Sequence, residues 1–232
     1  MILFVKLLLA HMLSDFLLQP NSWVEAKEKN KLKAWQLYAH TFIHFIITML
    51  IVWDLSFILW ATIIAAIHFV TDGFKVFFQF EKSRRVWFLA DQAMHISVIV
   101  IVAIWSQNIV ISFYPKLNEY YLFLGTFVYA LTQPVSAMIR FIISRWTSVT
   151  ENNDSLENAG NYVGILERLF VFAFVVSGNW DAIGFLLAAK SVFRFGDLKE
   201  SKDRKLTEYV LIGTLLSFGI AILAGIVFNS LL

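Results

Sequence analysis

The chain has 232 residues, of which 59% are hydrophobic and 16% charged, and its net charge is +2. This composition excludes a water-soluble globular domain and is typical of a protein that crosses a membrane several times. The chain contains no cysteine, which excludes disulfides and thiol chemistry, so any metal must be held by nitrogen and oxygen atoms. The small net charge gives no reason to expect a nucleic-acid partner.

Eight stretches are apolar enough to be predicted as membrane spans, each of which needs about 20 mostly apolar residues. In chain order they cover residues 1–19, 36–54, 57–80, 86–106, 119–145, 161–178, 181–197 and 206–231. The first resembles a signal peptide, but His11 and Asp15 interrupt it and no small-residue cleavage site follows, so we expect a retained helix. Pro134 is expected to kink the fifth span. The sequence therefore predicts an all-α polytopic membrane protein with about eight transmembrane helices.

The basic residues predict how these spans are oriented. The loops after the first, third, fifth and seventh spans are rich in Lys and Arg, whereas the intervening loops hold only Lys116. Because basic loops stay in the cytoplasm, both chain termini are expected to lie outside.

Each of the five histidines, all within the first 95 residues, has an Asp or a His four positions away. The pairs are His11 with Asp15, His40 with His44, His68 with Asp72, and Asp91 with His95. Residues four apart share one face of a helix, and composition alone would give a histidine such a neighbour only roughly one time in ten. Ionisable groups within a membrane cost about 2.5–3.5 kcal/mol each, which makes them functional candidates.

The predicted topology brings the four pairs into one layer in the cytoplasmic half of the membrane, given a rise of about 1.5 Å per helical residue. A weak internal repeat indicates two similar hairpins. The segment LLAHMLSDF resembles AAIHFVTDGF, and LYAHTFIHF can be aligned with FLADQAMHI. We therefore expect residues 1–106 to form a four-helix bundle with ligands pointing inward, and residues 107–232 to form a second four-helix half.

The eight side chains are predicted metal ligands for one or two divalent ions, zinc foremost and iron or manganese as alternatives. Gln19, Lys75 and Gln92 lie on or beside the same faces, where they could orient ligands or substrate. An Asp could instead serve as a general base or proton relay. The competing interpretation is a metal-free network of His–Asp hydrogen bonds, which at about 0.6 kcal/mol each offset little of the cost of burial.

The second half carries its own charged residues in predicted spans six to eight. They are Glu167, Arg168, Lys190, Arg194 and Glu208. One interpretation is ion pairing between these acids and bases within the membrane. The other is an anion pocket for a phosphate or lipid head group, with Arg168, Lys190 and Arg194 as its ligands.

The motifs AHMLSDFLLQP, HTFIH, IHFVTDGFK and DQAMH resemble the bacterial membrane family catalogued as domain of unknown function 3307. The resemblance covers about residues 1–106 and implies a bacterial inner-membrane location without implying an activity. The His/Asp pattern is also similar in style to predicted membrane-bound metal-dependent hydrolases, which is a distant analogy.

These observations favour a metal-dependent integral membrane enzyme, a hydrolase or group transferase that acts on a lipid or lipid-linked substrate from the cytoplasmic leaflet. The catalytic residues are not assigned. A divalent-metal transporter or channel is the first alternative, although its ligands should reach both membrane faces. A metal-stabilised scaffold or sensor is the second, and it requires a fully enclosed site.

Overall fold

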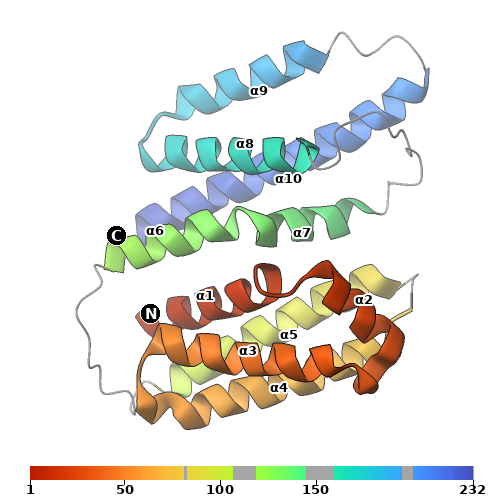
Figure 1. Ribbon diagram of the computed structural model, residues 1–232. Coiled ribbons are helices and arrows are strands. Elements are labelled where there is room, and N and C mark those ends of the chain that lie inside the picture. The colour runs from red at the N-terminus through yellow and green to blue at the C-terminus, as the bar shows by residue number, and fades with distance from the viewer. Residues whose placement is uncertain (81–82, 107–118, 145–158, 195–200, 232) are drawn as a thin grey trace. The chain divides into compact units, whose positions relative to one another are not determined.

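The computed structural model describes residues 1–80, 83–106, 119–144, 159–194 and 201–231, with the backbone alone for residues 193–194 and 201–207. The described residues form helices and connecting turns, without strands (Figure 1). The first half contains α1 (Ile2–Phe16), α2 (Asn21–Asn30), the 3-10 helix η1 (Lys31–Lys33), α3 (Trp35–Val52), the 3-10 helix η2 (Leu55–Phe57), α4 (Ile58–Phe78) and α5 (Arg84–Trp105). The second contains α6 (Glu119–Ala130), α7 (Gln133–Ile143), α8 (Ala159–Val176), α9 (Trp180–Arg194) and α10 (Ser201–Ser230).

Six helical segments among the described residues are long and apolar enough to cross a membrane. They are Trp35–Val52, Leu55–Phe78, Arg84–Trp105, Glu119–Ile143, Ala159–Val176 and Glu208–Ser230. A seventh span results if α1 and the α2–η1 segment, which are bent by 77° relative to each other, count as one. Helix α9 has only 15 residues. The all-helical class with about six candidate spans is therefore confirmed, whereas the count of eight and the outward termini stay predictions.

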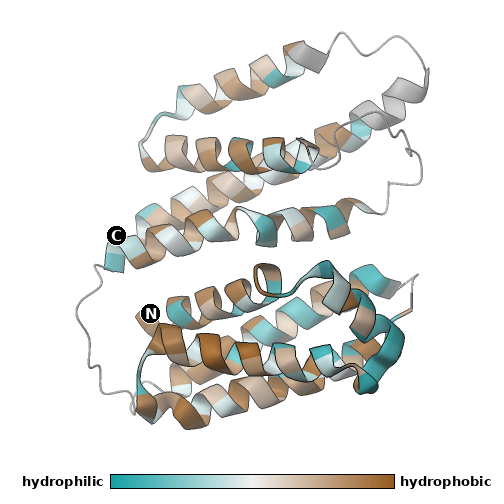
Figure 2. Ribbon diagram, viewed as in Figure 1, coloured by the Kyte–Doolittle hydropathy of each residue, from teal (hydrophilic) through white to brown (hydrophobic). Residues whose placement is uncertain are grey.

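The chain divides into two compact units, Met1–Thr126 and Phe127–Leu232. In the first unit, α1, α3, α4 and α5 form a closed ring in which each helix packs against two others (Figure 1). One end of this bundle is apolar, with buried Leu7, Val52, Phe57, Ala61 and Ile99 forming its core. The other end, which carries α2, is hydrophilic (Figure 2).

Helix α2 is held against this polar end by several contacts. Pro20 is the N-cap residue of the helix, a position where proline's fixed backbone angle and missing N–H are tolerated. Lys31 Nζ donates to the Val76 carbonyl at 2.6 Å, near the end of α4. Glu28 accepts a hydrogen bond from Gln79 and pairs with Arg84 at 3.0 Å. These contacts link α2 and η1 to both α4 and α5.

In the second unit, α10 packs along α8 and also contacts α7, while α9 packs on α8. The closest approach is at Gly225, where an added Cβ would lie 2.6 Å from Val175 Cγ1. Between α6 and α7 the helix is interrupted, with Pro134 in the first turn of α7. The interruption lies where the sequence predicts a kink, because proline lacks the N–H that would continue the helical hydrogen bonds.

Candidate metal centre

The eight predicted ligands lie together inside the ring of α1, α3, α4 and α5, and we call them the His/Asp cluster. Each of the four helices contributes one pair, because a spacing of four residues places both side chains on the inward face. Seven of the eight are buried, and Asp15 is the most exposed, with 10% of its side-chain surface accessible. The predicted convergence of the four pairs is thus observed.

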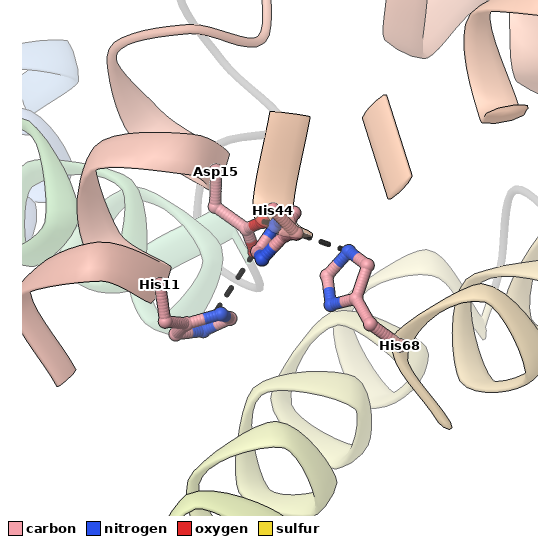
Figure 3. A group of neighbouring side chains, drawn as sticks. All are labelled: His11, Asp15, His44 and His68. Atoms are coloured by element: carbon pink, nitrogen blue, oxygen red, sulfur yellow. Dashed lines mark hydrogen bonds and ion pairs between the residues drawn. The ribbon is translucent and has the colours of Figure 1, made fainter. Parts of the chain in front are cut away.

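The Asp15 carboxylate is the point on which four histidines converge. His44 Nε2 donates to Asp15 Oδ1 at 2.8 Å, and His40 Nε2 lies 3.3 Å from the same oxygen. His68 Nε2 is 3.9 Å from Asp15 Oδ1, and His11 Nε2 is 3.8 Å from Oδ2. Figure 3 shows His11, Asp15, His44 and His68 pointing toward one another, and one ligand atom of each lies within 4.8 Å of the others. Three nitrogens and one oxygen at this spacing form a donor set typical of zinc, iron or manganese.

Two further groups of possible ligands continue from this one. The first consists of His40, His68 and Asp72, and the second of Asp72, Asp91 and His95. His40 Nε2 and His68 Nε2 are 3.1 Å apart, and His95 Nε2 lies 3.9 Å from Asp91 Oδ1. Because neighbouring groups share His68 or Asp72, the His/Asp cluster is one continuous array of donor atoms.

The imidazole rings of the His/Asp cluster stack on one another. The ring centroids of His44 and His68 are 3.6 Å apart and those of His68 and His95 are 4.1 Å apart, and both pairs are stacked. Two positive charges at these distances would repel each other strongly inside a bundle of low dielectric constant. Neutral imidazole is also the form that binds metals.

Two of the three carboxylates are paired with lysines. Lys27 Nζ lies 2.6 Å from Asp72 Oδ2, and Lys75 Nζ lies 2.8 Å from Asp91 Oδ2. Lys75 is one of the predicted auxiliary residues, whereas Lys27 is not. Lys27 lies on α2 and has only 5% of its surface exposed. Asp15 forms no such pair with a described lysine, so its negative charge faces only histidines and an amide.

That amide belongs to Gln92, which bridges two of the ligands. Its Nε2 donates to Asp15 Oδ2 at 3.1 Å, and its Oε1 lies 3.3 Å from His11 Nε2. Gln92 therefore contacts two of the predicted ligands, and its orienting role stays a prediction. Gln19 lies in the bend after α1, and its Nε2 is buried without a hydrogen-bond partner among the described residues. Thr71, which the sequence analysis did not single out, lies with its Oγ1 2.6 Å from His95 Nε2.

A small cavity of about 10 Å³ adjoins the histidines. His11, His44, His68 and His95 line its polar side, and Leu7, Thr48, Ile64, Ile67, Val98 and Ile99 line the remainder. This volume is about that of one water molecule. The cavity therefore provides space for one small ligand beside three of the nitrogens that converge on Asp15.

The charged residues of the second unit have other partners. Lys190 Nζ pairs with Glu167 Oε2 at 2.6 Å, so the ion pairing considered for these spans is present. Arg168 Nε donates to the Leu131 carbonyl at 2.7 Å, and its Nη2 donates to the Thr132 carbonyl. The guanidinium thus satisfies the Leu131 carbonyl at the break between α6 and α7, and it adds a second donor to the Thr132 carbonyl, which also accepts from the Ser136 N–H. The side chain of Arg194 lies outside the described residues.

These features define a class: an all-helical protein with about six candidate membrane-spanning helices and a buried His/Asp cluster in its first unit. A family model described as a protein of unknown function (DUF3307) matches residues 3–124, and the chain belongs to this family. The match confirms the resemblance carried by the His/Asp motifs and extends beyond residue 106. No curated protein matches the chain. No solved structure matches it either.

Proposed function

We propose that the first unit binds one divalent metal ion at His11, Asp15, His44 and His68, and that this ion serves a hydrolase or group transferase. The observation that carries the proposal is the convergence of three imidazole nitrogens and a carboxylate within 4.8 Å. Zinc fits this donor set best, and iron or manganese also suits it. The remaining members of the His/Asp cluster offer a second position, but lysines already pair with both of its carboxylates.

The charges of the cluster support a single ion. Three carboxylates and two lysines, with neutral histidines, leave one negative charge in a buried site. A divalent ion next to Asp15 converts this into one positive charge. Such a site stabilises an anionic nucleophile or a developing oxyanion, which are the species that hydrolysis and group transfer require. A second divalent ion would add two more positive charges at carboxylates that are already neutralised.

The cavity supports a catalytic role over a structural one. Catalytic zinc sites leave a coordination position for water, and the cavity has room for about one water beside His11, His44 and His68. A bound metal would lower the pKa of that water. His95 lines the same cavity without belonging to the Asp15 group, and Thr71 holds its Nε2. We assign His95 as the general base that accepts the water proton.

The location of the cluster favours a substrate that partitions into a membrane. Apolar helices long enough to cross a membrane surround the cluster, and the polar end of the bundle carries the basic segment α2. Basic segments stay on the cytoplasmic side. We therefore place the substrate in the cytoplasmic leaflet of a bacterial inner membrane.

A divalent-metal transporter is the second candidate, because the three ligand groups share residues and form a continuous array. Adjacent sites of this kind suit an ion that moves from one to the next. Against it, the opposite end of the bundle is closed by the apolar core of Leu7, Val52 and Phe57, which offers no ligand. The enzyme is therefore the better-supported proposal.

The function is tested with purified protein in nanodiscs made from total bacterial lipid. We expect a new lipid product, identified by mass spectrometry, that a chelator abolishes and added Zn²⁺, Fe²⁺ or Mn²⁺ restores. Asp15→Asn should form no product, while Asp181→Asn, an exposed carboxylate of α9, should match the unaltered protein. Metal-loaded protein that forms no product in any of these lipids, or that transports the ion in proteoliposomes, would overturn the enzyme proposal.

A further inference from the structure

The second unit contains a cavity of about 510 Å³ that the proposed metal chemistry does not use. Residues of α7, α8, α9 and α10 line it, all within Phe127–Leu232. The volume falls in the range of small-molecule sites, which is about 300–1,000 Å³. It lies outside the residues matched by the family model, so family membership says nothing about it.

The charges that line this cavity are mainly positive. Arg140, Arg168 and Lys190 contribute three cations, against the single acid Glu167. Arg168 is committed to backbone carbonyls and hydroxyls, and Lys190 is paired with Glu167. Arg140 is exposed and takes part in none of the ion pairs found among the described residues. The cavity thus has a guanidinium available for an anion.

The remaining walls are of two kinds. Ile139, Ile143 and Val163 are apolar, whereas Asn161 and Tyr209 can donate hydrogen bonds. Gly160, Gly164 and Gly213 also line the cavity and add no side-chain volume to it. A ligand that fits such walls has an anionic, hydrogen-bonding part and an apolar part.

We propose that this cavity binds an anionic phospholipid, with Arg140 contacting the phosphate and the isoleucines contacting the start of an acyl chain. Arginine forms paired, charge-assisted hydrogen bonds with phosphate oxygens. The volume is far larger than a free phosphate needs, and apolar walls would contribute nothing to binding that ion. The sequence analysis named Arg168, Lys190 and Arg194 for this role but not Arg140. The cavity shares no lining residue with the cavity beside the metal centre.

Native mass spectrometry of the detergent-purified full chain provides the test, with dioleoyl phosphatidic acid, dioleoyl phosphatidylcholine and inorganic phosphate as probes. We expect phosphatidic acid to bind more tightly than phosphatidylcholine. Arg140→Gln should lower the affinity for phosphatidic acid about tenfold, as expected from the loss of a charged hydrogen bond. Arg85→Gln, which removes an arginine of α5 that does not line the cavity, should leave binding unchanged.

Gly213→Leu provides a second variant that keeps all charges. A Cβ at Gly213 would make ordinary van der Waals contact with Ile143 Cδ1 at 3.8 Å, so the helix tolerates it, while the rest of the side chain reduces the cavity volume. The Gly213→Leu variant should bind both phosphatidic acid and phosphatidylcholine more weakly than the unaltered protein does. Equal affinity for the two lipids, equal effects of Arg140→Gln and Arg85→Gln, or complete displacement of the lipid by millimolar phosphate would each overturn the proposal.

Discussion

Lys27 donates a hydrogen bond to Asp72 across 2.6 Å, from a short helix that crosses the end of the bundle to a carboxylate inside it. Both side chains are buried, with 6% of each exposed. The lysine occupies a position where a cation is needed, because Asp72 also belongs to two of the three possible ligand groups. In the proposed one-ion centre, this tethered ammonium group would take the place of a second metal ion.

Replacing Lys27 should lower the stability of the protein and make it depend on added metal. Lys27→Met keeps the length of the side chain but leaves the Asp72 charge without its partner, and breaking a buried ion pair in this way costs about 3–5 kcal/mol. We expect a lower unfolding temperature in the absence of metal, measured by thermal denaturation in detergent. Excess Zn²⁺ should restore the stability of this variant more than it raises that of the unaltered protein, because Asp72 becomes free to bind an ion.

Lys29→Met is the matched control, because Lys29 lies on the same helix and is exposed. Its unfolding temperature should be unchanged. If Lys27→Met and Lys29→Met behaved alike, the Lys27–Asp72 pair would have no role in stabilising the cluster.

His95 should separate catalysis from metal binding. His95→Gln removes the proposed general base while leaving His11, Asp15, His44 and His68 in place. The metal content should stay unchanged, and the turnover of the lipid substrate should fall by a factor of about 10²–10⁴. Loss of the metal together with the activity would instead make His95 a ligand.

Gln92 should set the affinity of the centre without being a ligand. Gln92→Leu removes the amide that bridges His11 and Asp15, and loss of such a supporting contact typically lowers metal affinity about 10–100-fold. Competition with a fluorescent zinc chelator measures this change. Ser97→Ala, on the exposed face of the same helix α5, should leave the affinity unaltered. Equal affinities for the two variants would show that Gln92 does not support the centre.

Arg168 should be essential for the stability of the second unit. Arg168→Met leaves the Leu131 carbonyl without its donor at the break between α6 and α7, and an unsatisfied buried group costs about 1–3 kcal/mol. The variant should unfold at a lower temperature, whereas Arg140→Gln, which alters an exposed arginine of α7, should not. A stable Arg168→Met protein would argue against this structural role.

The sequence predicted the convergence of the cluster because spacing is a local property. A pair four residues apart must share a helix face, and four such faces can be buried together only by pointing inward. The contacts of Lys27 were not predictable in this way. A basic segment carries Lys27, Lys29, Lys31 and Lys33 at alternate positions. Only Lys27 of these is buried, where α2 packs against α3 and α4.

The role of Arg168 also depends on a distant feature. The sequence places Arg168 next to Glu167 in an apolar span, where an ion pair or an anion site is the natural interpretation. Its carbonyl partner at Leu131 lies at the break between α6 and α7, where Pro134 begins another helix. The kink was predictable from the proline, but the choice of the arginine that satisfies it comes from tertiary packing.

Metal analysis by inductively coupled plasma mass spectrometry tests the central claim most directly. Protein purified from cells grown with Zn²⁺, Fe²⁺ and Mn²⁺ should contain about one of these ions per chain. Asp15→Asn should contain none, while Asp181→Asn should keep the full content. A metal-free unaltered protein, or an Asp15→Asn protein that retains its ion, would contradict a metal centre at Asp15.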